Sequence, residues 1–223
     1  MSATIVKLGG SLASSPQREA WLAALVSWGG PLILVPGGGP FADAVRDSQD
    51  RLGFDDVAAH RMALLAMEQF AVALSSYSKA FVLAASRRDM DAAINAGKIP
   101  IWLPSLMALG APDVPACWDV TSDSLAAWLA GIYPAPRLLL IKSCDLRGPV
   151  SARDLVAHKI VDPLFPHFAA KSRAAVWIAG PASLPGAAAL LQCGGMPGVG
   201  VAPDAMQPIP SARSDSLRKA EAN

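Results

Sequence analysis

Two glycine-rich segments near the N-terminus carry residue types that bind phosphate. The first contains Lys7, Gly9, Gly10 and Ser11 directly after a short apolar run. Glycines that follow a strand let the backbone turn tightly and expose its N–H groups, and a lysine at the strand end adds a positive charge for phosphate oxygens. The segment therefore predicts a phosphate-binding loop. A glycine turn with a surface lysine is the alternative that this segment, taken alone, leaves open.

The second glycine-rich segment contains Gly37, Gly38 and Gly39, between another apolar run and a helical pattern that starts at Phe41. Unpaired backbone N–H groups and the helix dipole converge at such a helix N-terminus and favour an anion there. Two anion-binding loops on neighbouring strands would face each other across a gap. They suit a reaction that joins two phosphorylated or carboxylated molecules, so here the functional interpretation outweighs the structural one.

A third segment, residues 118–127, combines acidic and hydroxyl side chains at the start of a helical pattern. Asp119, Thr121 and Asp123 alternate along it. The helix dipole stabilises a carboxylate in the first turn, which is a purely local explanation for Asp123. The same groups are also suited to orient a lysine that meets phosphate. This segment alone does not separate the two interpretations.

A fourth segment places Lys142, Ser143 and Asp145 directly after the apolar run 138–140. If that run is a strand of the same sheet, these side chains lie at the edge where the other segments lie. An ordinary polar turn is the alternative interpretation.

The elements that must position these residues alternate between apolar runs of strand length and helical patterns. The apolar runs lack polar alternation, which is typical of strands buried on both faces. We therefore predict an α/β fold, a three-layer α/β/α sandwich with a mostly parallel central sheet, whose loops collect along one edge. The predicted strands are residues 4–8, 32–35, 80–84, 99–103, 138–142, 175–179 and 198–202, and the predicted helices are residues 18–28, 41–51, 56–77, 87–96, 123–130 and 184–192.

Length and composition limit the kinds of protein that this chain can be. Its 223 residues suit one domain, and 52% hydrophobic residues are enough for a sheet covered on both faces. We expect a single domain over residues 1–206 and a flexible polar tail over residues 207–223. A net charge of +1 provides no electrostatic footprint for nucleic acid, which we do not expect as a partner.

Cysteine spacing and hydropathy indicate the compartment. Cys117, Cys144 and Cys193 lack the spacing of a zinc or redox site, which predicts reduced thiols in the cytoplasm. We find no signal-peptide pattern and no apolar run of the roughly 20 residues that cross a bilayer. We therefore expect a soluble protein that does not bind membranes.

The chain resembles the amino acid kinase superfamily in four segments, which are, in order, V-K-L-G-G-S-L, V-P-G-G-G-P-F-A-D-A-V-R, W-D-V-T-S-D-S-L-A-A-W-L-A and I-K-S-C-D-L. The resemblance spans about residues 4–180. The second and third segments are most similar to the aminomethylfuran phosphate kinase branch, which serves the synthesis of one-carbon carriers of the methanofuran type.

This resemblance implies an ATP-dependent, Mg²⁺-requiring kinase that phosphorylates an aminomethylfuran phosphate to its diphosphate. It also implies a cytoplasmic homo-oligomer with a small-molecule substrate. The alternatives are another small-molecule kinase of the superfamily, of the uridylate or acetylglutamate type, and a non-catalytic relative that binds nucleotide or anion.

The resemblance further implies a role for each residue of the four segments. Lys7 is expected to stabilise the transferring phosphoryl group and Asp123 to orient that lysine. The residues expected on the nucleotide side are Gly9, Gly10, Ser11, Lys142, Ser143 and Asp145. The residues expected on the acceptor side are Gly37, Gly38, Gly39, Asp43, Asp119 and Thr121. No metal-binding residue of the chain itself is expected.

One part of the superfamily pattern is absent from this chain. Many relatives carry a second phosphate-binding lysine in a Gly-Gly-Met-x-x-Lys segment, for which Lys171 and Lys159 are the possible substitutes here. An acceptor oxygen that is already anionic needs no general base, so we expect no catalytic role for His60, His158 or His167. The amine of an aminomethylfuran phosphate acceptor is expected to bind Asp43, Asp119 or Asp123. The aromatic ring of this acceptor is expected to contact Phe41 or Trp118.

Overall fold

The computed structural model describes residues 2–146, 148 and 150–202. Within these residues eight strands form a sheet, in which all neighbouring strands are parallel except for one antiparallel pair. The strands are β1 (Thr4–Leu8), β2 (Leu32–Pro36), β3 (Phe81–Ala84), β4 (Ile99–Trp102), β5 (Arg137–Ile141), β6 (Val150–Ser151), β7 (Ala175–Ala179) and β8 (Val199–Ala202). Their order across the sheet is β3-β4-β2-β1-β5-β7-β8-β6, and β7 and β8 are the antiparallel pair.

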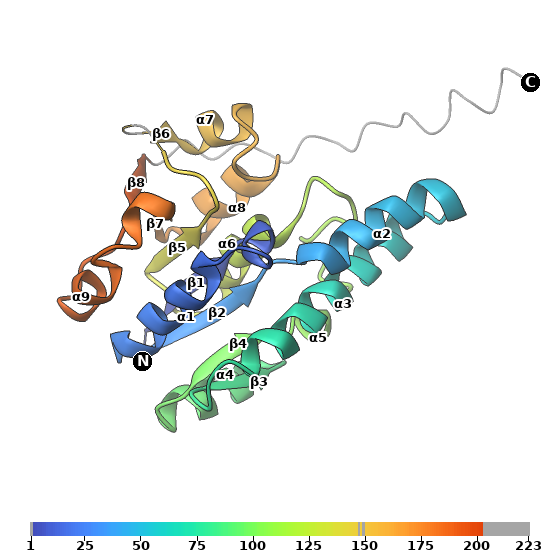
Figure 1. The fold of residues 1–223 in the computed structure, drawn as a ribbon. Helices are drawn as coiled ribbons and strands as arrows, with labels where there is room; N and C mark the ends of the chain where they lie inside the picture. The colour runs from blue at the N-terminus through green and yellow to red at the C-terminus, as the bar shows by residue number, and fades with distance from the viewer. Residues whose placement is uncertain (1, 147, 149, 203–223) are drawn as a thin grey trace, which may run out of the picture.

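Helices cover both faces of this sheet (Figure 1). Figure 1 shows α2 and α3 side by side on one side of the molecule and α9 on the opposite side. The helices of the described residues are α1 (Gln17–Trp28), α2 (Gly39–Leu52), α3 (Asp56–Ser75), α4 (Arg87–Asn95), α5 (Ser105–Ala108), α6 (Ser122–Ile132), α7 (Ala152–Ala157), α8 (Phe165–Ser172) and α9 (Ala187–Gln192), with the short 3-10 helices η1 (Gly10–Leu12) and η2 (Pro181–Ser183).

The central strand β1 divides the core into two layers. Its side chains alternate, so that Ile5 packs in the cluster that contains α6 and α8, whereas Val6 and Leu8 pack in the cluster that contains α1 and α9. This arrangement confirms the predicted three-layer sandwich with a mostly parallel sheet. Lys7 extends toward the same face as Ile5, which is the face that α6 covers.

The strand register brings three of the predicted functional segments to one edge of the sheet. The last residue of β1, Leu8, lies opposite Pro36 of β2 and Ile141 of β5, and both pairings are parallel. The loops that follow these three strands therefore leave the sheet at the same level. Ligands bind at this edge of open α/β sheets because the loops after the strands meet there.

The predicted elements are recovered almost completely. All seven predicted strands form, with ends within one residue of the prediction, and the six predicted helices form with small shifts of their ends. The prediction missed β6, α5, α7 and α8. Pro166 stands in the first turn of α8, where proline is compatible with a helix, although in the sequence it resembles a helix breaker. The predicted domain boundary at residue 206 and the tail 207–223 lie outside the described residues.

Helix α3 is the most apolar long helix in the described part of the chain. Its length and its mean hydropathy of 1.2 would suffice to cross a membrane. However, Leu64 and Met67 pack in one core cluster and Phe70 and Leu74 in the other. Core helices of water-soluble proteins have the same length and composition, so α3 is weak evidence for a membrane. The expected lack of membrane binding stays a prediction.

Candidate active site

The two glycine loops contact each other backbone to backbone at the edge of the sheet. The N–H of Gly37 donates to the carbonyl oxygen of Leu8 at 2.9 Å. A methyl group on Gly37 would lie 2.3 Å from the backbone nitrogen of Gly10, and one on Gly10 would lie 2.6 Å from that of Gly39. Any side chain at these positions would push the loops apart. The sequence thus requires glycine here because the two main chains pack directly together.

The second glycine loop leads directly into α2. Gly38 is the N-cap residue of α2 and no side chain caps this helix, and Gly39, at its first position, has a φ of 53°. The N-terminal N–H groups of a helix without a side-chain cap remain available to an anion, and the helix dipole favours negative charge there. This end of α2 is therefore suited to hold a phosphate.

A buried cluster of charged side chains lies beside the first loop. The ammonium nitrogen of Lys7 lies 2.9 Å from one carboxylate oxygen of Asp123, and that of Lys142 lies 2.6 Å from the other. The contact of Lys7 has the distance of an ion pair without the geometry of a hydrogen bond, whereas Lys142 donates hydrogen bonds to Asp123 and to the carbonyl oxygen of Ile160. Lys7 is thus the less constrained of the two lysines.

Burial and charge act against each other in this cluster. All three side chains are at least nine-tenths buried. Burial opposes the ionisation of Asp123, but Lys142 and Lys7 outweigh it and lower the pKa of the carboxyl group. Burial lowers the pKa of Lys7, against the attraction of Asp123. Two lysines thus flank one carboxylate beside the first loop, and an arrangement of this kind suits the binding of phosphate oxygens.

A second buried carboxyl group, that of Asp162, holds the start of α6 in place. It accepts hydrogen bonds from the backbone N–H groups of Thr121 and Ser124, both at 3.0 Å, and from both hydroxyl groups of these residues. Burial and the nearby charge of Asp123 raise the pKa of Asp162. Because Thr121 makes no side-chain cap of its own, Asp162 is the cap of α6 and thereby sets the position of Asp123.

The sequence prediction missed Asp162. In the sequence it stands before Pro163, which is the pattern of an ordinary turn. Its role arises only because the chain returns behind the N-terminus of α6. No local signal would have identified it.

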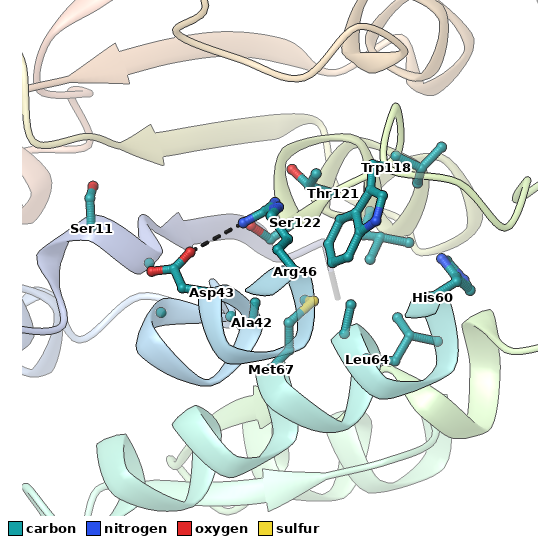
Figure 2. A pocket seen from close by; sticks show the side chains of 16 residues that line it. Ser11, Ala42, Asp43, Arg46, His60, Leu64, Met67, Trp118, Thr121 and Ser122 are labelled. Carbon is teal, nitrogen blue, oxygen red and sulfur yellow. Dashed lines mark hydrogen bonds and ion pairs between the residues drawn. The ribbon is translucent and has the colours of Figure 1, made fainter. Parts of the chain in front are cut away.

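A pocket lies between the glycine loops, α2, α3 and the segment that leads into α6 (Figure 2). Its volume is about 230 Å³, which is below the ~300–1,000 Å³ of pockets for drug-sized ligands and suits a small metabolite. The residues that line it are Gly10, Ser11, Gly38, Gly39, Ala42, Asp43, Arg46, His60, Ala63, Leu64, Met67, Trp118, Val120, Thr121, Ser122 and Leu125.

Charged and aromatic side chains pair with one another in this pocket. Arg46 lies 3.2 Å from the carboxylate of Asp43 and stacks over the ring of Trp118, 4.4 Å from its centre (Figure 2). The indole N–H of Trp118 donates to Gln49 at 2.6 Å. The aromatic ring that the sequence analysis associated with the acceptor, Trp118, thus lines the pocket.

The structure brings some of the predicted acceptor residues to the pocket and keeps others away. Gly38, Gly39, Asp43 and Thr121 line it, together with Gly10 and Ser11 from the first loop. Asp119 does not line it and is exposed.

The predicted nucleotide-side residues of the fourth segment have different surroundings. Ser143 accepts a hydrogen bond from Ser11 at 3.0 Å, which joins the first loop to this turn. Asp145 accepts one from the backbone N–H of Ala182 at 2.8 Å, which fastens the turn to the loop after β7. Lys142, by contrast, is buried at Asp123 and not in the turn itself.

The position of Lys142 bears on the missing second lysine. Lys171 pairs with Asp113 at 2.8 Å, and Lys159 is exposed; neither lines the pocket. Lys142 therefore supplies the second ammonium group beside Asp123. The sequence could have suggested it, because Lys142 follows a predicted strand of the same sheet.

Comparisons with known proteins relate this chain to one family. The family model described as "Amino acid kinase family" matches residues 2–145. A curated protein of Methanocaldococcus jannaschii, (5-(aminomethyl)furan-3-yl)methyl phosphate kinase, is 27% identical over 176 residues, which are 73% of this chain and 80% of that protein.

Solved structures share the fold at low sequence identity. The uridylate kinase of Archaeoglobus fulgidus is similar with a TM-score of 0.65 and 15% identity, over 89% of this chain and all of that chain. The UMP kinase of Ureaplasma parvum has a TM-score of 0.62 and 14% identity, over 81% and 90% of the two chains. The aspartate kinase of Synechocystis has a TM-score of 0.65 and 13% identity, over 93% of this chain but 41% of that chain.

The fold, the glycine loops and these relatives define an ATP-dependent kinase. The chain belongs to the amino acid kinase family, whose model matches well over half of its length. Among the described residues, no group of three or more histidine, cysteine, aspartate or glutamate side chains is placed to hold a metal ion.

Proposed function

We propose that this kinase transfers the terminal phosphoryl group of ATP to the phosphate of (5-(aminomethyl)furan-3-yl)methyl phosphate and forms the diphosphate. The observation that carries the proposal is the composition of the pocket. Gly38 and Gly39, at the N-terminus of α2, line one part, and Trp118, which packs with apolar side chains of α2 and α3, lines another. An acceptor with a phosphate and a small ring matches both parts. The name of the Methanocaldococcus jannaschii relative supports the same acceptor.

The chain's own residues supply positioning and charge. In the proposed reaction, an oxygen of the acceptor phosphate forms a bond to the terminal phosphorus of ATP while the bond to ADP breaks. Lys7 neutralises charge on the transferring group, and Asp123 holds Lys7 in place. Lys142 adds a second positive charge on the other side of Asp123. The acceptor oxygen is anionic at neutral pH, so no side chain has to remove a proton.

The nucleotide is proposed to lie on the side of the first loop. Gly9 and Gly10 would present N–H groups to its phosphates, with the hydroxyl groups of Ser11 and Ser143 beside them. Asp145 would keep the adjoining turn in position. Mg²⁺ would neutralise phosphate charge and be held mainly by the phosphates themselves, as is usual for this ion.

The acceptor is proposed to lie on the side of the second loop. Gly37 holds that loop against β1, while Gly38 and Gly39 face the acceptor phosphate. Thr121, at the start of α6, lines the pocket beside them. Asp43, which lines the pocket, remains the candidate carboxylate partner for the acceptor amine, whereas Asp119 lies outside the pocket.

A turnover assay with ATP and Mg²⁺ tests this proposal. We expect kcat/KM for the aminomethylfuran phosphate to exceed that for uridylate and for acetylglutamate by at least tenfold, and we expect mass spectrometry to detect the diphosphate. Faster turnover of uridylate would reject the acceptor but not the kinase. Uridylate kinase is the second candidate because two solved structures with this fold are uridylate kinases.

We further propose that the enzyme is a cytoplasmic homo-oligomer without nucleic-acid or membrane partners. Its net charge of +1 is consistent with the absence of a polyanion partner. The oligomeric state follows from the resemblance alone, and sedimentation of the purified protein would test it.

A further inference from the structure

His60 is a buried histidine that the proposed chemistry does not use. It lies in α3 with 7% of its surface exposed, and it lines the pocket. Figure 2 shows it at the end of the pocket opposite Ser11. The residues of α3 that line the pocket are His60, Ala63, Leu64 and Met67, which share one helix face because of their spacing. His60 is the polar member of an otherwise apolar wall.

The imidazole of His60 has a buried nitrogen atom without a hydrogen-bond partner. Its Nε2 atom is buried and unpaired, and no other buried side-chain nitrogen or oxygen that lines the pocket in the described residues is unpaired. Burial lowers the pKa of His60, which favours the neutral ring with one N–H donor and one lone pair. A buried polar atom without a partner is destabilising, so a group that enters the pocket is expected to pair with it.

Several other polar side chains of the pocket already have partners. The carboxylate of Asp43 pairs with Arg46, and Arg46 stacks on Trp118. The hydroxyl group of Thr121 donates to Asp162. His60 is thus a free polar contact at the end of the pocket away from Ser11 and its glycine loop.

We propose that His60 determines acceptor specificity by a hydrogen bond between its imidazole and the polar group at the end of the acceptor remote from the phosphate, with the lone pair of the neutral ring accepting from an amine. This inference rests on the proposed function, for which that group is the aminomethyl nitrogen. The acceptor class is therefore a small phosphate monoester with a ring and a hydrogen-bonding group beyond it. On this view His60 contributes to amine recognition that the sequence analysis assigned to a carboxylate.

Two acceptors and three variants test the inference. The acceptors are (5-(aminomethyl)furan-3-yl)methyl phosphate and furan-3-ylmethyl phosphate, which lacks the amine. For His60→Leu we expect kcat/KM to fall roughly 5- to 150-fold with the first acceptor, as for the loss of one buried hydrogen bond, and to change little with the second. His60→Gln should recover part of the loss, because its amide reaches about as far as Nε2. The exposed His158, changed to Leu, is the matched control and should leave both acceptors unaffected.

A purely structural role for His60 would lower the stability of its variants, whereas the proposed role would not. His60→Leu removes an unpaired polar atom from an apolar wall, so we expect the Tm of the ligand-free variant to equal or exceed that of the wild type. A lowered Tm with equal losses for both acceptors would overturn the inference. The inference would also be overturned if Asp43→Asn lost the preference for the amine-bearing acceptor while His60→Leu kept that preference.

Failure of the proposed function is distinguishable from failure of this inference. If the wild type phosphorylates uridylate and neither furan compound, the proposed acceptor is wrong. The remote group is then the uracil base, and the comparison becomes uridylate against ribose 5-phosphate in the same variants. His60→Leu must then lower kcat/KM for uridylate selectively, and equal effects on both would overturn the inference.

Discussion

Lys7 and Lys142 share the carboxylate of Asp123 but hold different positions in the cluster. Lys142 is fixed by hydrogen bonds to Asp123 and to the carbonyl oxygen of Ile160. Lys7 makes one ion-pair contact at 2.9 Å. When it turns toward a phosphate, Lys7 gives up one contact, whereas Lys142 would have to leave two partners. We infer that Lys7 contacts the transferring group and that Lys142 mainly supports it.

Replacement of Lys7 by alanine tests this assignment. We expect kcat to fall about 100-fold or more, as for the loss of a group that stabilises charge in the transition state. The fold should remain intact, because Asp123 keeps its pairing with Lys142. Circular dichroism and turnover on the same sample measure both quantities.

A surface ion pair provides the matched control. Lys171 pairs with Asp113 and is half exposed. Lys171→Ala should change the free energy of unfolding by at most ~1 kcal/mol and leave turnover unchanged. A near-normal rate in Lys7→Ala would remove Lys7 from the site.

At the scale of elements, the two glycine loops act as one unit. Gly37 and Gly10 approach so closely that the loops after β1 and β2 cannot move independently. Helix α6 is tied to the same region, because Asp162 caps its N-terminus and Asp123 lies in its first turn. Nucleotide side and acceptor side are therefore held in a fixed relation, which in-line transfer of a phosphoryl group requires.

A methyl group between the glycine loops should disturb this relation. We expect Gly37→Ala to lower the free energy of unfolding by about 1–3 kcal/mol through overpacking. A displacement of about 1 Å should lower kcat/KM about 100-fold. Urea unfolding and turnover measure the two effects.

Gly200 offers the control for this substitution. A methyl group there would meet its nearest atom, Nε1 of Trp177, at 3.8 Å, an ordinary contact. Gly200→Ala should therefore leave turnover unchanged. If Gly37→Ala were destabilised but fully active, the close contact between the glycine loops would not be needed for catalysis.

At the scale of the whole molecule, the site draws on segments from across the chain. The loops after β1, β2 and β5 reach the same edge because these strands are parallel and in register. Helix α3 closes the pocket from one side, and the segment before α6 closes it from the other (Figure 2). A ligand that binds here contacts η1, α2, α3 and the start of α6, and it should stabilise the native state because it binds only the folded chain.

Thermal unfolding with nucleotide tests this expectation. At a concentration of ATP and Mg²⁺ near 100 times Kd, the native state gains about 2.7 kcal/mol. For a domain of this size, Tm should rise by roughly 5–10 °C. ATP without Mg²⁺ should produce a smaller shift. No shift at millimolar nucleotide would favour the alternative of a non-catalytic relative.

Much of the fold and part of the site could be predicted because their signals are local. Strands buried on both faces are continuous apolar runs, and the two glycine segments directly follow such runs. Lys7 and Asp123 were expected to meet, and the structure brings them within 2.9 Å. The sequence prediction missed short elements such as α8 and β6 because few residues define each of them.

The sequence by itself determined the order of strands and helices, the α/β class and the place of the glycine loops, since periodicity and glycine chemistry act over neighbouring residues. Only the tertiary structure decided that Lys142 joins Asp123, that Asp162 caps α6 and that His60 faces the pocket. These contacts join segments distant in the chain. Burial, and with it the pKa and the pairing of each polar group, depends on which segments pack together, and no local pattern encodes that.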